Sequence, residues 1–307
     1  MTNTHVRRMI DWYIYSHFAH GGIMMTIQKI AAIHDITGIG RCGLSVAMPL
    51  LSALGHQVCP LPTAVLSTHP GGFNNLYMRP LTADTDAILA HWTQEHITFD
   101  ALYTGFLCTP AQADCITEAV TRMEPGFVLV DPVLGDHGKL YSLADDNMVA
   151  AMRSLAAAAD LITPNLTEAF ALLGEPYRGG IFSLADAEAI AEALAVQFQA
   201  DCILKGVPLD ENGHMTNLLH LHNSRRTITA AYTAVPQGYP GTGDAFASLL
   251  LGIMLHTRDL EHAFRTATRV TTELVLHTYK KRTPPREGVL LEDFCPHLHT
   301  HCGCPVD

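Results

Sequence analysis

The residues with the clearest chemical potential form a glycine-rich turn late in the chain, Gly241-Thr242-Gly243-Asp244. The apolar run 245–255 that follows it predicts a buried helix. A helix that begins at such a turn presents unpaired backbone N–H groups and the positive end of its dipole, and both favour an anion. Asp244 can simply cap this helix, or it can accept a proton from a group that attacks the bound anion.

Polar side chains also follow four apolar runs that predict buried strands. Because the C-terminal ends of parallel strands meet at one edge of an open sheet, we expect these side chains to lie together. Anion binding, carboxylates for a metal ion and a base that orients the nucleophile are the requirements of phosphoryl transfer. The residues are Asp35, Asp131 with Asp136, Asn165 with Glu168, and Lys205.

Each of these positions also has a purely structural interpretation. Asp131 and Asp136 can be turn and capping residues. Asn165 and Glu168 have the spacing of a capping box, in which each side chain bonds the other residue's backbone N–H. For Asn165 and Glu168 the two roles are compatible.

Predicted strands alternate with predicted helices along the chain, which favours one doubly wound α/β domain with a mostly parallel sheet. We expect this domain to span residues 25–290. The strands are expected at 27–33, 57–61, 99–107, 127–130, 161–162 and 201–206, with a hairpin at 215–221 and 226–231. The helices are expected at 44–54, 84–94, 110–123, 145–159, 183–199, 245–257 and 260–279.

The two ends of the chain differ from the predicted domain. Residues 1–24 have no clear periodicity and do not form a signal peptide, so we interpret them as an appendage, disordered or translated upstream of a true start. Residues 291–307 are rich in Cys and His, but their spacing matches no common zinc pattern. We therefore expect a disordered tail. Its Cys and His residues are Cys295, His297, His299, His301, Cys302 and Cys304.

Composition limits the possible partners. A net charge of −11 argues against nucleic acid or an anionic membrane surface as partner. No apolar run approaches the roughly 18–20 residues of a membrane span. The eight cysteines are scattered, several within apolar runs, which indicates reduced thiols in a cytoplasmic protein.

Three motifs carry a family resemblance: G-T-G-D-A-F at 241–246, D-P-V-L-G-D at 131–136 and T-P-N-L-T-E at 163–168. In this order and spacing they resemble the ribokinase-like superfamily. A-A-I-H-D at 31–35 and S-T-H at 67–69 are similar to its pyridoxal/pyridoxine (vitamin B6) kinase branch. The resemblance covers residues 27–281 and implies a ribokinase-like fold. It also implies ATP-dependent phosphorylation of the 5′-hydroxymethyl group of a B6 vitamer, a small-molecule substrate.

The resemblance assigns roles to the polar residues. Asp244 would be the base, and the backbone amides of Gly241, Thr242 and Gly243 would hold the transferred phosphoryl group. ATP would contact Asp131, Asn165, Glu168, Lys205 and Tyr141. Mg²⁺ would lie near Asp131, Asp136 and Glu168, partly through water. A monovalent cation such as K⁺ and a homodimer would also fit relatives of this kind.

The substrate-binding positions implied by the resemblance are Asp35, Leu66, Thr68, His69 and Pro70, and three of them depart from the usual pattern. Asp35 replaces a small hydroxyl residue, Leu66 an aromatic residue and Pro70 a threonine. An ionised Asp35 would favour a protonated ring nitrogen or the amine of pyridoxamine. Alternatively, Asp35 only caps the following helix.

Two other functions remain open. A hydroxymethylpyrimidine kinase belongs to the same superfamily and acts on a similar heteroaromatic alcohol. An NAD-dependent oxidoreductase would use Gly38, Gly40 and Gly43, which spell G-x-G-x-x-G. The required acid after the second strand is missing, which counts against the oxidoreductase.

Overall fold

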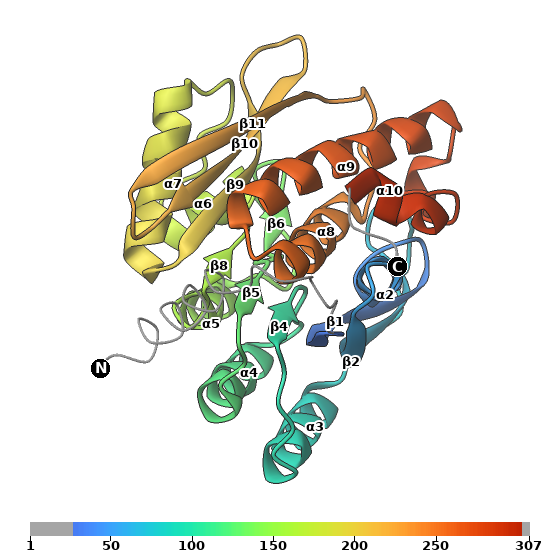
Figure 1. Cartoon of the computed structure of the whole chain (residues 1–307), viewed down its shortest axis with the longest axis vertical. Helices are drawn as coiled ribbons and strands as arrows, with labels where there is room; N and C mark the ends of the chain where they lie inside the picture. Colours follow the sequence, from blue (N-terminus) through green and yellow to red (C-terminus); the bar gives the residue numbers. More distant parts are fainter. Residues whose placement is uncertain (1–26, 303–307) are drawn as a thin grey trace, which may run out of the picture.

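The computed structural model describes residues 27–302 and contains a nine-stranded sheet flanked by helices (Figure 1). The strand order is β11-β10-β9-β8-β5-β4-β1-β2-β3. From β2 to β9 across the sheet all neighbours are parallel, whereas β3, β10 and β11 pair antiparallel. The strands are β1 (Lys29–Ile39), β2 (Gln57–Thr68), β3 (Met78–Pro80), β4 (Ala101–Thr104), β5 (Val128–Val130), β8 (Leu161–Ile162), β9 (Asp201–Pro208), β10 (His214–Leu221) and β11 (Arg226–Thr233). A separate hairpin is formed by β6 (Gly135–Asp136) and β7 (Lys139–Leu140).

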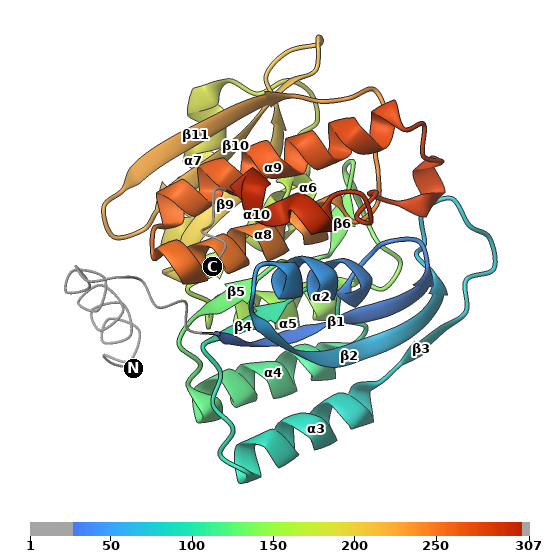
Figure 2. The same cartoon turned by 45° about the vertical axis from the view of Figure 1, so that its right-hand side comes forward.

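Helices cover both faces of the sheet and bury two large apolar cores (Figure 2). The prediction of a doubly wound, mostly parallel α/β fold is thereby confirmed. One face carries α3 (Thr82–Gln94), α4 (Pro110–Met123), α5 (Asp146–Ala156), α6 (Leu166–Leu173) and α7 (Leu184–Phe198). The other face carries α2 (Leu44–Ala53), α8 (Thr242–Thr257), α9 (Leu260–Lys280) and α10 (Leu298–Cys302). Two short 3₁₀ helices, η1 (Pro285–Glu287) and η2 (Cys295–His297), connect α9 to α10.

Several helices begin where short polar side chains accept the first unpaired backbone N–H groups. Thr109 accepts from the Gln112 N–H at the start of α4, and Ser183 accepts from the Asp186 N–H at the start of α7. Such caps contribute about 1 kcal/mol each. They explain why the sequence placed these two helix starts correctly.

Strand β1 is longer than predicted, and the difference changes the interpretation of Asp35. The strand continues beyond Ile33 because the segment up to Ile39 pairs with β2, across an irregularity between His34 and Ile36. Helix α2 then begins after Gly43, without any side-chain cap. The interpretation of Asp35 as a cap of this helix is therefore wrong.

The C-terminal segment is ordered and packed as far as it is described. Phe294, Leu298 and Cys302 are buried against the core shared by α2, α8 and α9. The expectation of a disordered tail is wrong for residues 291–302, because these apolar side chains pack into the core. Cys304 and residues 1–24 lie outside the described residues.

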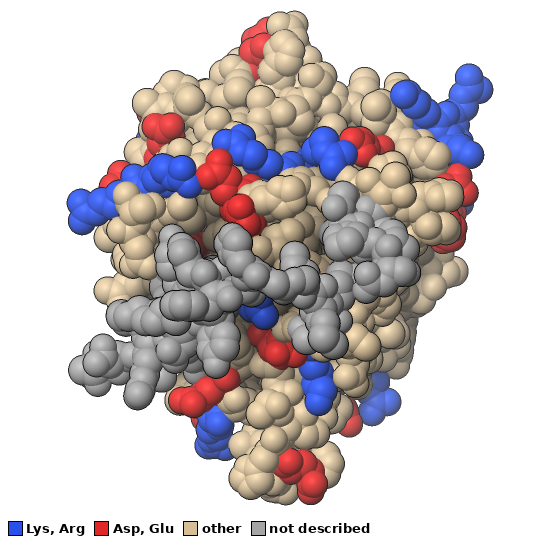
Figure 3. Space-filling view, in the orientation of Figure 1, with Lys and Arg blue, Asp and Glu red and all other residues tan. Residues whose placement is uncertain are grey.

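Acidic and basic side chains are interspersed on the face shown in Figure 3. Within residues 27–302, no helix is both long and apolar enough to cross a membrane. Among the same residues, no three His, Cys, Asp or Glu side chains are grouped so that they could hold a metal ion directly.

Candidate active site

The glycine turn before α8 is held in a conformation that only glycine adopts easily. Gly241 has φ +82°, and a Cβ at this position would lie 2.2 Å from the backbone oxygen of Arg41. The Thr242 hydroxyl donates to the Tyr239 carbonyl oxygen at 2.7 Å, which closes the turn. As predicted from the sequence, α8 starts directly at this turn, with the first backbone N–H groups of the helix free of any side-chain cap.

Asp244 lies in the first turn of α8 and is only 7% exposed. Its Oδ2 accepts a hydrogen bond from the Gly43 N–H at 2.7 Å, and its Oδ1 lies 3.1 Å from Nε2 of His34. Burial alone would raise the pKa of this carboxyl, but the charge and hydrogen bond of His34, helped by Gly43 and the Cys42 thiol, lower it to about 2. Asp244 is therefore an ionised acceptor at neutral pH, as a base that orients an attacking hydroxyl must be.

A buried ion pair lies beside the glycine turn. The Lys205 ammonium donates to Oδ1 of Asp131 at 2.7 Å. A Cβ added to Gly243 would lie 3.6 Å from Lys205 Nζ and 4.0 Å from Asp131 Oδ2, so the turn faces this pair closely. Burial lowers the pKa of Lys205. The nearby charges of Asp131 and Glu168 have a larger, opposite effect, so the pKa is raised above its ordinary value. The lysine is therefore a buried cation close to the glycine turn.

Asn165 and Glu168 form the predicted capping box at the start of α6. The Glu168 N–H donates to Asn165 Oδ1 at 3.0 Å, and the Asn165 N–H donates to Glu168 Oε2 at 2.8 Å. Glu168 Oε1 also accepts from the Leu134 N–H, and the Asn165 amide donates to the Gly135 carbonyl. Burial raises the pKa of Glu168 to about 8, against the opposing effect of Lys205. These two residues therefore anchor the chain that follows β5, whatever else they bind.

The hairpin β6–β7 carries two further predicted residues, which are exposed. Asp136 accepts from the N–H of the following residue, His137. Tyr141 is 41% exposed, and burial together with the nearby charges of Glu168 and Asp136 raises the pKa of its hydroxyl. Tyr141 and Asp136 thus lie in the electrostatic neighbourhood of Glu168, at the edge of the site and open to solvent.

The predicted substrate residues lie at the ends of β1 and β2 and in the loop after β2. Leu66 is buried in a small cluster with Cys108, and Thr68 pairs with Ile39 across the strands. The imidazole of His69 lies 2.7 Å from the backbone oxygen of Arg286, and Pro70 is exposed. The contacts of these residues hold the loop after β2 in place, and the contacts named here are not with Asp244.

His34 is the functional residue that the sequence interpretation missed. Its imidazole is 2% exposed and lies between the carboxylates of Asp35 and Asp244, so it connects β1 to the start of α8. The available signal was a histidine at the C-terminal end of a buried strand, next to an acid. Its partner Asp244 is 210 positions away, so no local pattern points to the contact.

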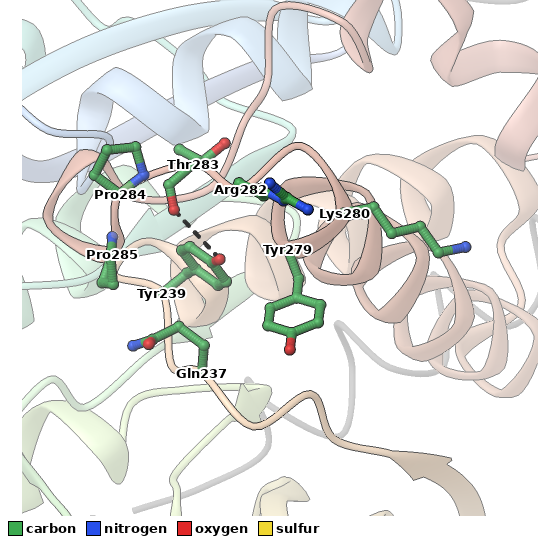
Figure 4. Close-up of a pocket in the computed structure, with 8 residues that line it drawn as sticks. All are labelled: Gln237, Tyr239, Tyr279, Lys280, Arg282, Thr283, Pro284 and Pro285. Carbon is green, nitrogen blue, oxygen red and sulfur yellow. Dashed lines mark hydrogen bonds between the residues drawn. The ribbon is translucent and has the colours of Figure 1, made fainter.

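A cavity of about 400 Å³ borders the glycine turn (Figure 4). It lies beside the segment that leads into the turn, since Gln237 and Tyr239 are among its lining residues. Its lining includes the aromatic Tyr239 and Tyr279 and the cationic Lys280 and Arg282, residue types that suit a ring joined to a phosphate chain. The cavity is lined by Gln237, Tyr239, Tyr279, Lys280, Arg282, Thr283, Pro284 and Pro285.

Comparison with known proteins identifies the family. A profile of the family described as phosphomethylpyrimidine kinase matches residues 50–284, most of the chain. The chain belongs to the phosphomethylpyrimidine kinase family. A putative phosphomethylpyrimidine kinase from Bacteroides thetaiotaomicron is 35% identical and superimposes with a TM-score of 0.83, covering 94% of this chain and 98% of the other. The same protein has also been solved with pyridoxal, with a TM-score of 0.82.

Two further relatives have different names: one is called a pyridoxal kinase and the other a hydroxymethylpyrimidine/phosphomethylpyrimidine kinase. The pyridoxal kinase of Lactobacillus plantarum is 30% identical, with a TM-score of 0.82 over 90% of this chain and 98% of the other. The hydroxymethylpyrimidine/phosphomethylpyrimidine kinase of Bacillus subtilis is 29% identical over 257 residues, which are 83% of this chain and 91% of that protein.

Family membership defines the reaction class. The chain is an ATP-dependent small-molecule kinase, as the three motifs predicted. The interpretation of Gly38, Gly40 and Gly43 as a dinucleotide site is wrong. Gly38 lies within β1, and the turn before α2 places the Gly43 N–H on Asp244 instead of leaving it for a pyrophosphate.

Proposed function

We propose that the enzyme transfers the γ-phosphoryl group of ATP to the 5′-hydroxymethyl group of a B6 vitamer, with Asp244 as the base. The observation that carries the proposal is the position of Asp244, ionised at the start of α8 and one residue after Gly243, which faces the Lys205–Asp131 pair. Backbone amides of the turn would hold the transferred group while Asp244 accepts the hydroxyl proton.

The nucleotide is proposed to extend from the glycine turn into the cavity beside Tyr239. The base would occupy the cavity, and Lys205 would contact the phosphates. Asn165 and Tyr141 would lie at the phosphate end, beside the β6–β7 hairpin. This arrangement makes Lys205 the main side-chain cation for the transferred group.

The carboxylates of the site fit Mg²⁺ held through water. Oxygen ligands and retained waters are what Mg²⁺ prefers. Asp131 Oδ1 already binds Lys205 and both Glu168 oxygens accept backbone N–H groups, so a dry cage is not formed. We assign Asp131, Asp136 and Glu168 to waters of the ion, which would neutralise charge on the phosphates. Activity assays with K⁺ exchanged for Na⁺ test the additional monovalent cation.

A B6 vitamer is favoured as the alcohol because the 35% identical relative has been solved with pyridoxal. Leu66, Thr68, His69 and Pro70 are proposed to border the ring, from the ends of β1 and β2. Hydroxymethylpyrimidine is the second candidate, supported by the family profile and by the Bacillus subtilis relative. Both molecules present a hydroxymethyl group on a nitrogen heterocycle, so the same catalytic residues serve either one.

A substrate panel tests the proposed function. Purified enzyme with ATP and Mg²⁺ is assayed for ADP formation with pyridoxal, pyridoxine, pyridoxamine, hydroxymethylpyrimidine and ribose. We expect the highest kcat/KM for one of the three vitamers. Higher kcat/KM for hydroxymethylpyrimidine would replace the proposed substrate, and turnover of none of the five by folded enzyme would refute the proposal.

We further propose a homodimer in the cytoplasm. Four exposed apolar side chains, Ile36, Ile39, Val65 and Tyr77, lie near the C-terminal ends of β1 and β2 and the start of β3, which is the kind of surface that a second copy would cover. Six cysteines among the described residues (Cys42, Cys59, Cys108, Cys115, Cys202 and Cys295) are free thiols, which suits a reducing compartment. Light scattering of the purified protein tests the dimer, and a monomer at micromolar concentration would contradict it.

A further inference from the structure

We propose that His34, held by Asp35, is a positioning residue that keeps the Asp244 carboxylate ionised and oriented toward the substrate hydroxyl. This inference rests on the proposed function in one respect, the role of Asp244 as base. The contacts that support it do not depend on which alcohol is the substrate.

The imidazole joins two carboxylates. His34 Nδ1 lies 2.7 Å from Asp35 Oδ1, and Nε2 lies 3.1 Å from Asp244 Oδ1. Ionised carboxylates only accept hydrogen bonds, so both ring nitrogens must carry a proton, which is the imidazolium form. The backbone nitrogen of Asp35 also lies 2.9 Å from Nδ1 and would need this atom as an acceptor. The contact with the carboxylate is shorter and charge-assisted, so it takes the proton of Nδ1.

Asp35 is in turn fixed by its own neighbours. The Thr37 hydroxyl donates to Asp35 Oδ2 at 2.7 Å, and the Asp35 side chain is 6% exposed. Each carboxylate oxygen of Asp35 therefore already accepts a side-chain hydrogen bond. These two contacts fix the Asp35 carboxylate in a position that orients His34. Any effect of Asp35 on the substrate would then be transmitted through the His34 imidazole.

Neighbouring residues pack closely around the ring of His34. A Cβ added to Gly105 would lie 1.9 Å from Cδ2 and 2.0 Å from Nε2 of His34, so the absence of a side chain at 105 makes room for the ring. The ring of Tyr103 meets it edge-on at 6.1 Å. The ring therefore occupies space that any larger residue at position 105 would fill.

The charge of His34 is needed because Asp244 lies among other acids. Burial lowers the pKa of His34, but Asp244 and Asp35 outweigh it and raise the pKa to about 10. Without this cation, burial would raise the pKa of Asp244, opposed by the hydrogen bonds of Gly43 and Cys42. The titratable groups around His34 and Asp244, on all the elements packed there, are Asp35, Cys42, Tyr103, Asp131, Tyr141 and Lys205.

Nuclear magnetic resonance of ¹⁵N-histidine-labelled protein tests the ion pair without reference to activity. We expect one histidine to keep both ring nitrogens protonated at about pH 8, where free imidazole is neutral. This signal should be absent in His34→Gln, should titrate at lower pH in Asp35→Asn, and should persist in His220→Gln, which removes a buried histidine on β10. Histidines that are all neutral at this pH would overturn the inference.

The pH dependence of kcat/KM tests the positioning role, with ATP and the alcohol that the substrate panel selects. In His34→Gln we expect the acid limb to move up by about one unit or more and kcat near neutral pH to fall by about 10–100-fold. His220→Gln should keep the wild-type profile. An unchanged acid limb in folded His34→Gln would overturn the role of His34. The substrate panel decides the substrate separately, because the imidazolium signal does not depend on it.

Discussion

The ammonium of Lys205 on β9 and the carboxylate of Asp131, which follows β5, meet at 2.7 Å across the end of the intervening strand β8. The pair lies beside Gly243, so the turn proposed to bind the transferred phosphoryl group faces a buried cation with a fixed partner. A charged pair held in this way does not need to reorganise when a phosphate arrives, which is the main source of electrostatic catalysis.

Replacement of Lys205 by methionine should reduce both activity and stability. We expect kcat/KM for ATP to fall by about 10²–10³-fold, because the transferred phosphoryl group loses its side-chain cation. The free energy of unfolding should fall by about 3–5 kcal/mol, because Asp131 is left buried and unpaired.

The control for this variant is Lys281→Met. Lys281 forms an exposed pair with Asp293, and such pairs contribute about 0–1 kcal/mol. Urea unfolding and steady-state kinetics measure both variants. Equal effects of the two substitutions would contradict the assignment of Lys205 to the site.

A comparison of Gly241→Ala with Gly55→Ala should separate the cost of a positive φ from the cost of a steric clash. Gly55 has a similar φ, +86° against +82°, but a Cβ there would meet nothing within 4 Å. Gly55→Ala should therefore cost about 1–2 kcal/mol and leave kcat unchanged. Gly241→Ala should cost more and lower kcat by at least about 10²-fold, since the added carbon would push the turn away from Arg41. If both variants keep wild-type kcat, the amides of the turn do not hold the phosphoryl group.

The ion pair of His34 and Asp244 should stabilise the fold in a defined pH range. The pKa of His34 is raised from 6.5 to about 10, so its contribution is complete below pH 6.5 and is lost as the pH rises through 10. The pKa of Asp244 is lowered from 3.8 to about 2, so its contribution is present above pH 3.8 and is lost as the pH falls through 2. The difference in unfolding free energy between wild type and His34→Gln should therefore be larger at about pH 6 than at about pH 10. A difference that does not change with pH would show that His34 acts by packing alone.

Leu298→Ala tests the packing of the C-terminal segment. This side chain is fully buried against α2 and α9, so truncation should cost about 2–5 kcal/mol. His297→Ala, one residue earlier and exposed, should have little effect on thermal unfolding. Equal melting temperatures for both variants and wild type would restore the interpretation of this segment as a dispensable tail.

The fold was largely predictable because its signals are local. Alternating strands and helices, the Thr109 and Ser183 caps and the box of Asn165 with Glu168 all depend on residues within a few positions of one another. The extension of β1 was missed because His34 interrupts the apolar run, and only its pairing with β2 makes that segment a strand.

The sequence predicted which residues belong to the candidate site better than it predicted the contacts between them. Asp131 and Lys205 were expected at one sheet edge, and the structure shows that they meet there. Asp35 was expected at the substrate or as a cap; it does not cap α2, and its bonds to His34 and Thr37 were not predicted. Such contacts depend on how distant strands and helices pack, which residue types and spacing do not encode.

Asp244→Asn is the substitution that tests the central claim most directly. Asparagine can still accept the hydrogen bond of Gly43 or that of His34, but it cannot accept a proton. Steady-state kinetics and nucleotide-binding titration should be measured on the same preparation. The account predicts that kcat falls by about 10²–10⁴-fold while the dissociation constant for ATP stays within about threefold. A variant that unfolds more easily but turns over at the wild-type rate would show that Asp244 only holds α8 against Gly43 and His34.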